Sequence, residues 1–142
     1  MIPAMRQGVV PGLLLAVAAC SAEPTAPDGA GLCWRMIEHP DKRPGFEILA
    51  RDVPNLESCA VQLEGVRLMQ GSVTAGAYNG HFIFATEAQI TSSQTLSGAR
   101  VRVFEAEDLE KVREALGALI EQQRADGAAP VRIPGLTAPA DQ

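Results

Sequence analysis

The sequence predicts an α+β fold in which a small, mainly antiparallel sheet carries two helices on one face. Short segments of alternating apolar and polar residues recur along the chain, bounded by Gly, Pro, Asn and Asp. Two longer segments instead carry apolar residues at helical spacing. The segments follow the order ββαβββα, and 142 residues are enough for one compact core.

A hairpin and a helix are predicted first. Leu32–Ile37 is typical of a strand, the turn-rich segment EHPDKRPG follows, and the alternation resumes over Phe46–Val53. Asn55 is a suitable N-cap for a helix with Glu57 in its first turn, and Gly71 ends it. The apolar face of this helix contains Leu56, Cys59, Ala60, Leu63 and Val66.

Three more strands and the second helix are predicted next. The strands are expected over Tyr78–Ala85, Gln89–Ser92 and Ala99–Phe104. Asn79-Gly80 permits a hairpin turn, but the apolar residues on both sides favour a bulge in one longer strand. The helix begins at Glu107-Asp108. Its apolar stripe contains Leu109, Val112, Leu116, Leu119 and Ile120.

The first twenty residues are typical of an export signal. Arg6 is the single basic residue near the start, and an apolar run from Val9 to Ala19 leads to Cys20. This run of about 11 residues is too short to cross a bilayer, which requires about 20 helical residues. We therefore predict a cleaved signal peptide over residues 1–19.

Val17-Ala18-Ala19-Cys20 resembles the lipobox of bacterial lipoproteins. The resemblance implies cleavage before Cys20 and a diacylglycerol on its sulfur, so that the membrane holds the protein through its acyl chains. The residue after the cysteine is Ser21 and not Asp. By the same resemblance, this favours the outer membrane. The alternative is ordinary cleavage near Ala19 or Ala22, which would give a soluble periplasmic protein.

The cysteines suit an exported protein. An exposed unpaired thiol is a liability in an oxidising compartment, and lipidation of Cys20 accounts for the odd one among three. Cys33 and Cys59 remain, and we predict that they form a disulfide closing a loop of about 26 residues. The alternative is two buried free thiols.

Both ends of the chain lack the apolar periodicity of a core. Residues 20–31 are rich in Pro, Ala and Gly, which predicts a flexible tether with a reach of about 18 Å between the lipid and the domain. Residues 32–124 are the predicted single domain. Residues 125–142 are predicted to be a disordered tail, and docking of Val131–Ile133 on a sheet edge is the alternative.

Few residues point to chemistry. A net charge of −5 repels phosphate backbones, so nucleic acid is not an expected partner. The chain has no nucleophile elbow, phosphate loop or Cys-x-x-Cys pair, and no cofactor or metal is predicted. His39 lies in a polar turn and His81 beside a strand, so surface positions are expected for both.

Arg100 and Arg102 alternate with Val101 and Val103. This pattern predicts both guanidinium groups on one sheet face, as an anion-binding or simply a solvated surface, and both valines in the core. Core positions are also expected for most aromatic side chains, which make up only 4% of the residues.

The leading hypothesis is a non-enzymatic lipoprotein domain that binds another envelope component, such as a protein or the cell wall. One alternative is an inhibitor of an envelope hydrolase, which requires an exposed rigid loop such as Glu38–Gly45. The other is a small periplasmic enzyme that uses His39 or His81 with neighbouring carboxylates.

Overall fold

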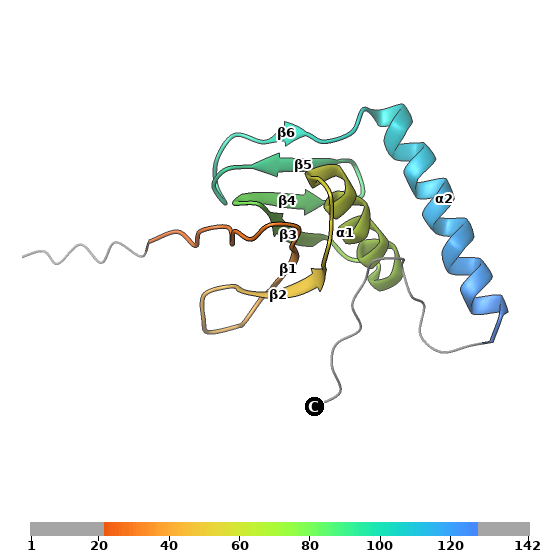
Figure 1. The fold of residues 1–142 in the computed structure, drawn as a ribbon, viewed down its shortest axis with the longest axis horizontal. Helices are drawn as coiled ribbons and strands as arrows, with labels where there is room; N and C mark the ends of the chain where they lie inside the picture. The colour runs from red at the N-terminus through yellow and green to blue at the C-terminus, as the bar shows by residue number, and fades with distance from the viewer. Residues whose placement is uncertain (1–21, 128–142) are drawn as a thin grey trace, which may run out of the picture.

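A computed structural model describes residues 22–127. The predicted signal peptide (1–19), Cys20 and most of the predicted C-terminal tail, including Val131–Ile133, lie outside these residues. The elements are β1 Cys33–Ile37, β2 Gly45–Ala50, α1 Leu56–Gln70, β3 Thr74–Tyr78, β4 His81–Ala85, β5 Ile90–Ser93, β6 Val101–Arg102 and α2 Ala106–Ala125 (Figure 1).

The strands form one sheet in the order β2-β1-β3-β4-β5-β6, and every neighbouring pair is antiparallel. The predicted α+β class and antiparallel sheet are therefore confirmed. The chain also follows the predicted order of elements, with one difference in the middle of the sequence: β4 accounts for most of the strand expected over Tyr78–Ala85, and β3, which ends at Tyr78, is an additional strand before it.

The predicted bulge at Asn79-Gly80 is wrong, because these residues are the turn of a hairpin. β3 pairs with β4 from Tyr78 and His81 outward, which leaves exactly these two residues between the strands. Their φ angles are 47° and 76°. A type I′ turn needs positive φ at both central positions, and Asn-Gly is its preferred sequence.

Small residues in β3 let α1 lie directly on the sheet. A Cβ atom at Gly76 would lie 2.1 Å from the carbonyl oxygen of Trp34 in β1 and 2.8 Å from both δ-methyl groups of Leu63 in α1. Only glycine fits between these neighbours. The same requirement explains why the alternation of β3 is weak in the sequence.

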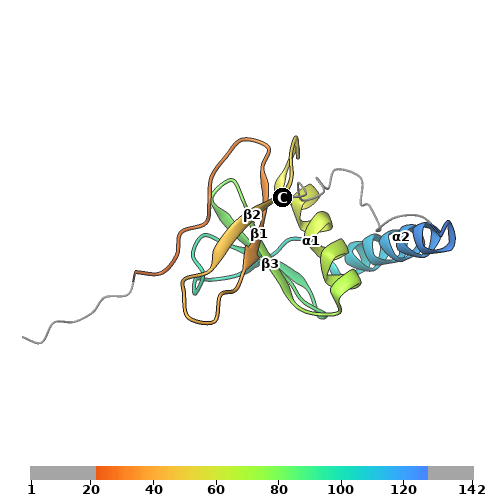
Figure 2. The ribbon, with the colours of Figure 1, turned by 90° about the horizontal axis from the view of Figure 1, so that it is seen from below.

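The first helix forms as predicted. The Asn55 side chain accepts a hydrogen bond of 2.8 Å from the backbone N–H of Ser58, and Gly71 ends the helix with φ at 70°. α1 covers one face of the sheet (Figures 1 and 2). The core between them contains Leu49, Val53, Ala60, Leu63, Val66, Ile83, Ala85 and Ile90.

Residues 22–31, here called the strap, pack on the opposite face of the sheet, which corrects the prediction of a flexible tether. Ala26 is only 5% exposed and belongs to a second apolar cluster with Ala77, Phe82 and Phe84. The strap has no periodicity because it crosses the strands without pairing along one. Ala26 and Ala77 are the two small buried residues of this cluster, and Phe82 and Phe84 are the two large ones.

Hydrogen bonds hold the strap at three further positions. The Pro27 carbonyl accepts from the N–H of Gly80 at 3.1 Å, and the Gly31 carbonyl accepts from the N–H of Val53 at 3.0 Å. Near its start, the Glu23 carboxylate accepts from the backbone N–H of Ser97 and, at 2.9 Å, from the Ser97 hydroxyl. The folded part of the chain therefore includes the strap.

α2 buries three apolar side chains along its length, those of Leu109, Leu116 and Ile120. Leu109 joins the core cluster that α1 covers, so both helices contribute to the same face of the sheet, as predicted. The helix then extends beyond the sheet, on the side away from the start of the strap (Figures 1 and 2). Within residues 22–127, no helix is long and apolar enough to cross a membrane.

Candidate functional site

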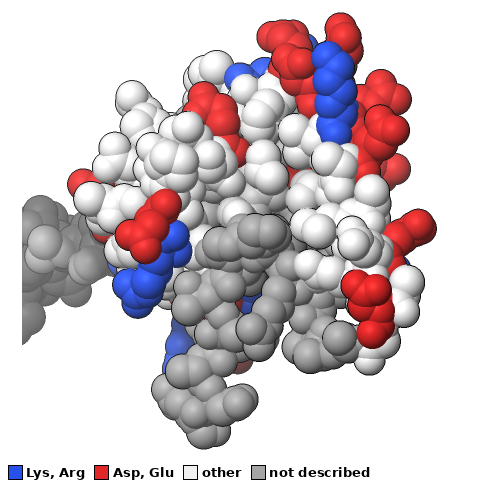
Figure 3. Space-filling model, turned by 45° about the vertical axis from the view of Figure 1, so that its right-hand side comes forward, with Lys and Arg blue, Asp and Glu red and all other residues white. Residues whose placement is uncertain are grey.

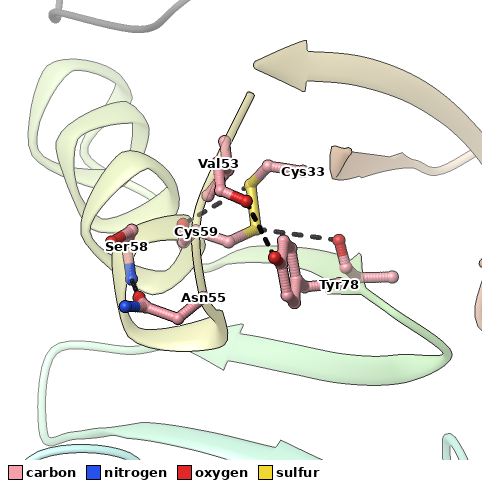
Figure 4. The surroundings of a disulfide bond; sticks show 7 residues. Cys33, Val53, Asn55, Ser58, Cys59 and Tyr78 are labelled. Carbon is pink, nitrogen blue, oxygen red and sulfur yellow. Dashed lines mark hydrogen bonds between the residues drawn. A yellow bond between two sulfur atoms is a disulfide. The ribbon is translucent and has the colours of Figure 1, made fainter. Parts of the chain in front are cut away.

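The predicted disulfide joins β1 to α1 at the centre of the domain (Figure 4). Cys33 and Cys59 have Cα atoms 5.3 Å apart, and both residues are fully buried. The sulfurs lie 3.6 Å from the carbonyl oxygens of Cys59 and Ala77. These are contacts and not hydrogen bonds, because a disulfide sulfur carries no proton.

The surroundings of the disulfide point to a structural role. The Tyr78 hydroxyl donates a hydrogen bond of 2.8 Å to the Val53 carbonyl and places its ring beside the sulfurs (Figure 4). No thiolate from solvent reaches either sulfur in the folded state, because thiol–disulfide exchange requires access to the attacked atom. The alternative of two free thiols is not what the structure contains.

The two histidines do not form a composite site. His81 begins β4, and strand pairing places it at the end of the sheet where β1 starts. His39 follows the other end of β1, where its ring lies next to Gly45. The Nδ1 atom of His81 lies 3.1 Å from the Asn79 carbonyl within its own turn. The two histidines are therefore too far apart to act on the same substrate or to bind the same metal ion.

Arg100 and Arg102 lie on the face opposite α1. The Arg100 guanidinium carbon is 3.8 Å from the centre of the Phe84 ring, which is a cation–π contact. Arg102 pairs with Thr91 of β5, and Thr91 pairs in turn with Phe84 of β4, so the three side chains share one face of the sheet. Arg102 also lies 3.4 Å from the Glu105 carboxylate in an exposed ion pair. Anion binding here stays a prediction.

The prediction of a core position is wrong for Val101, which is 66% exposed. Val103 does pack against the core. The difference follows from the short length of β6, because α1 does not reach over the edge of the sheet where Val101 lies. An open hollow of about 480 Å³ is found there, and its lining includes His81, Gln94, Thr95 and Val101.

A buried carboxylate that sequence reasoning did not single out connects the two helices. Glu64 in α1 is 0% exposed. Its two oxygens accept hydrogen bonds of 2.9 and 2.8 Å from Arg67 and one of 2.7 Å from Arg113 of α2. Arg113 also donates to the Thr86 carbonyl at 2.8 Å. Two cations thus share one anion at the junction of α1, α2 and the end of β4.

The hydrogen bond to Glu64 raises the pKa of Arg67 above its usual range, against the opposing effect of burial. Glu64 comes four residues after the buried Ala60, so helical spacing places it on the covered face of α1. That spacing, with Arg67 one turn later, is the signal in the sequence that would have identified it.

The segment from residue 38 to residue 44 projects between β1 and β2 as an exposed loop. The Lys42 N–H donates to the His39 carbonyl at 3.4 Å, and Pro40 and Pro44 restrict the backbone on either side. At the same end of the sheet, an open hollow of about 540 Å³ is lined by residues that include Met36, Glu38, Gln70 and Val73.

Within the described residues, no three His, Cys, Asp or Glu side chains lie together as a metal site would require. No protein-family model, curated protein or solved structure matches the chain.

Proposed function

We propose that this chain is an exported bacterial lipoprotein, anchored through Cys20, whose folded domain binds another component of the cell envelope. The observation that carries the proposal is the buried disulfide between Cys33 and Cys59. Protein disulfides persist in oxidising compartments such as the periplasm. Their pairing leaves Cys20, the cysteine of the lipobox-like segment, as the single cysteine available for another modification.

Binding is favoured over catalysis by the way the candidate residues are used. His39 and His81 lie at opposite ends of the sheet. The buried carboxylate of Glu64 is fully occupied by two arginines. General acid–base chemistry needs a group whose proton a substrate can reach, and Glu64 does not offer one.

Intact mass of the mature protein, purified from the membrane fraction of a bacterial host, tests the anchor. The expected mass carries acyl chains on Cys20 and increases by two hydrogens on reduction of the unfolded protein. The Cys20→Ser variant should carry no acyl chains, with the disulfide unchanged. Wild-type protein that is cleaved elsewhere and unacylated would contradict the proposal.

The His39→Ala and His81→Ala variants test the absence of catalysis. A binding domain should tolerate both changes, because both side chains lie away from the core clusters. Where deletion of the protein gives a growth or envelope defect that the wild type restores, failure of either variant to restore it, with an unchanged melting temperature, would favour the enzyme hypothesis instead.

Inhibition of an envelope hydrolase is a second candidate, favoured by the exposed loop over residues 38–44. A loop held between two paired strands can enter an active-site cleft with little loss of conformational entropy. The test is inhibition of purified peptidoglycan hydrolases and periplasmic proteases by the Cys20→Ser protein. Replacement of residues 40–43 by Gly and Ser should abolish any inhibition, whereas replacement of Asn79 by Gly in the opposite turn should not.

A further inference from the structure

The distance between the anchor and the folded domain is limited by the covalent chain. Glu23 is three residues after Cys20, so the Cα atoms of these residues lie at most about 11 Å apart. Glu23 itself is held by two hydrogen bonds from Ser97, in the connection between β5 and β6. A lipid on Cys20 would therefore bring this connection to the membrane surface.

Residues 94–101, here called the Ser97 end, have the properties of a surface that rests on headgroups. Most of these residues are exposed and uncharged, and Val101 is one of two exposed large apolar residues in the described part of the chain. Arg100 supplies the single charge, which is positive. The exposed Glu23 carboxylate, which Ser97 binds, balances this charge, so the surface as a whole is close to neutral.

Most of the net negative charge of the chain lies at the other end of the molecule. Between Glu105 and Asp126 there are seven acidic and three basic residues, so this segment carries −4 of the total net charge of −5. Figure 3 shows the acidic side chains gathered over α2. Figures 1 and 2 place α2 and the start of the strap at opposite ends of the long axis.

We propose that the strap seats the Ser97 end on the membrane surface and holds α2 away from it, with phospholipid headgroups as the binding partner. The orientation rests on the proposed lipidation of Cys20, and on Glu23 remaining bound to Ser97. Repulsion between α2 and anionic headgroups acts in the same direction as the short connection. The lipid anchor thus fixes which face of the domain meets a partner in the periplasm.

Paramagnetic broadening tests this orientation. The acylated full-length protein, with its acyl mass verified, is placed in lipid nanodiscs that contain a gadolinium-chelating headgroup lipid. Backbone amide signals of the Ser97 end and of Gly80 should be lost, whereas those of Glu121 and Arg124 in the last turns of α2 should keep their intensity. α2 is about 30 Å long, which separates these two groups of signals.

Two variants complete the experiment. Insertion of twelve Gly and Ser residues between Ser21 and Ala22 lengthens the reach to about 20 Å and should restore the lost signals. Glu23→Gln removes the charge that Ser97 binds and should restore them in part. Protein that is acylated but broadened equally at both ends would overturn the orientation alone. Protein that carries no acyl mass would overturn both this proposal and the lipoprotein assignment.

Discussion

Replacement of Glu64 by Gln should destabilise the domain more than any other single loss of charge among the described residues. The variant keeps the shape of the side chain, but its amide nitrogen would face the donating Nε of Arg67 in place of an oxygen. One charge-assisted hydrogen bond is then lost, which is worth about 1.5–3 kcal/mol, and the remaining bonds weaken. Removing one partner of a buried ion pair typically costs about 3–5 kcal/mol.

The guanidinium groups of Arg67 and Arg113 keep partial contact with water, with exposed fractions of 13% and 26%. We therefore expect the lower part of that range, about 3 kcal/mol. This corresponds to a fall in melting temperature of about 12 °C or more. Urea denaturation of the Cys20→Ser protein, followed by circular dichroism, measures the free energy of unfolding.

The matched control is Glu114→Gln, which removes an exposed carboxylate from α2 and should change the free energy of unfolding by less than about 0.5 kcal/mol. The raised pKa of Arg67 means that its contribution is complete below its ordinary pKa and is lost only as the pH rises through the higher folded value. The deficit of Glu64→Gln should thus be equal at about pH 7 and about pH 9. A deficit below about 1 kcal/mol would refute the reasoning.

Three more outcomes follow from packing and from the disulfide. Gly76→Ala should lower the free energy of unfolding by at least about 1–3 kcal/mol because its methyl group overlaps backbone, and unaltered stability would contradict the packing described. Gly117→Ala, whose added methyl group would have no other atom within 4 Å, should raise the free energy of unfolding by about 1 kcal/mol in the same urea denaturation. The double variant Cys33→Ala, Cys59→Ala should lose about 3.5 kcal/mol in urea, since the cross-link closes a 26-residue separation; equal midpoints with and without the bond would argue against this.

Local signals in the sequence were enough for the helices and for the disulfide. Asn55 and Gly71 mark the ends of α1 through backbone requirements that are met within a few residues. The pairing of Cys33 with Cys59 followed from the number of cysteines and from a helix facing a sheet. Such features need no knowledge of distant neighbours.

The strap, β3 and the Glu64 cluster could not be predicted as readily, because each depends on a distant partner. Ala26 is buried in a cluster with Ala77, Phe82 and Phe84, which come much later in the chain. Gly76 interrupts the apolar pattern of its strand because Leu63 of α1 occupies the space where a side chain at position 76 would lie. Arg113, which shares the charge of Glu64, is 49 residues away in sequence.

The position of the strap also has a consequence for the order in which we expect the chain to fold. Glu23 and Ser97 are 74 residues apart, and between them lie all the strands except β6. The strap leaves the ribosome before the rest of the domain, yet its binding surface on β3, β4 and the Ser97 end exists only once that sheet has formed. Contacts of such long separation are slow to form because the loop must close first. We therefore expect the first part of the domain to be synthesised to settle last, and until it does, Phe82 and Phe84 would be open to other chains.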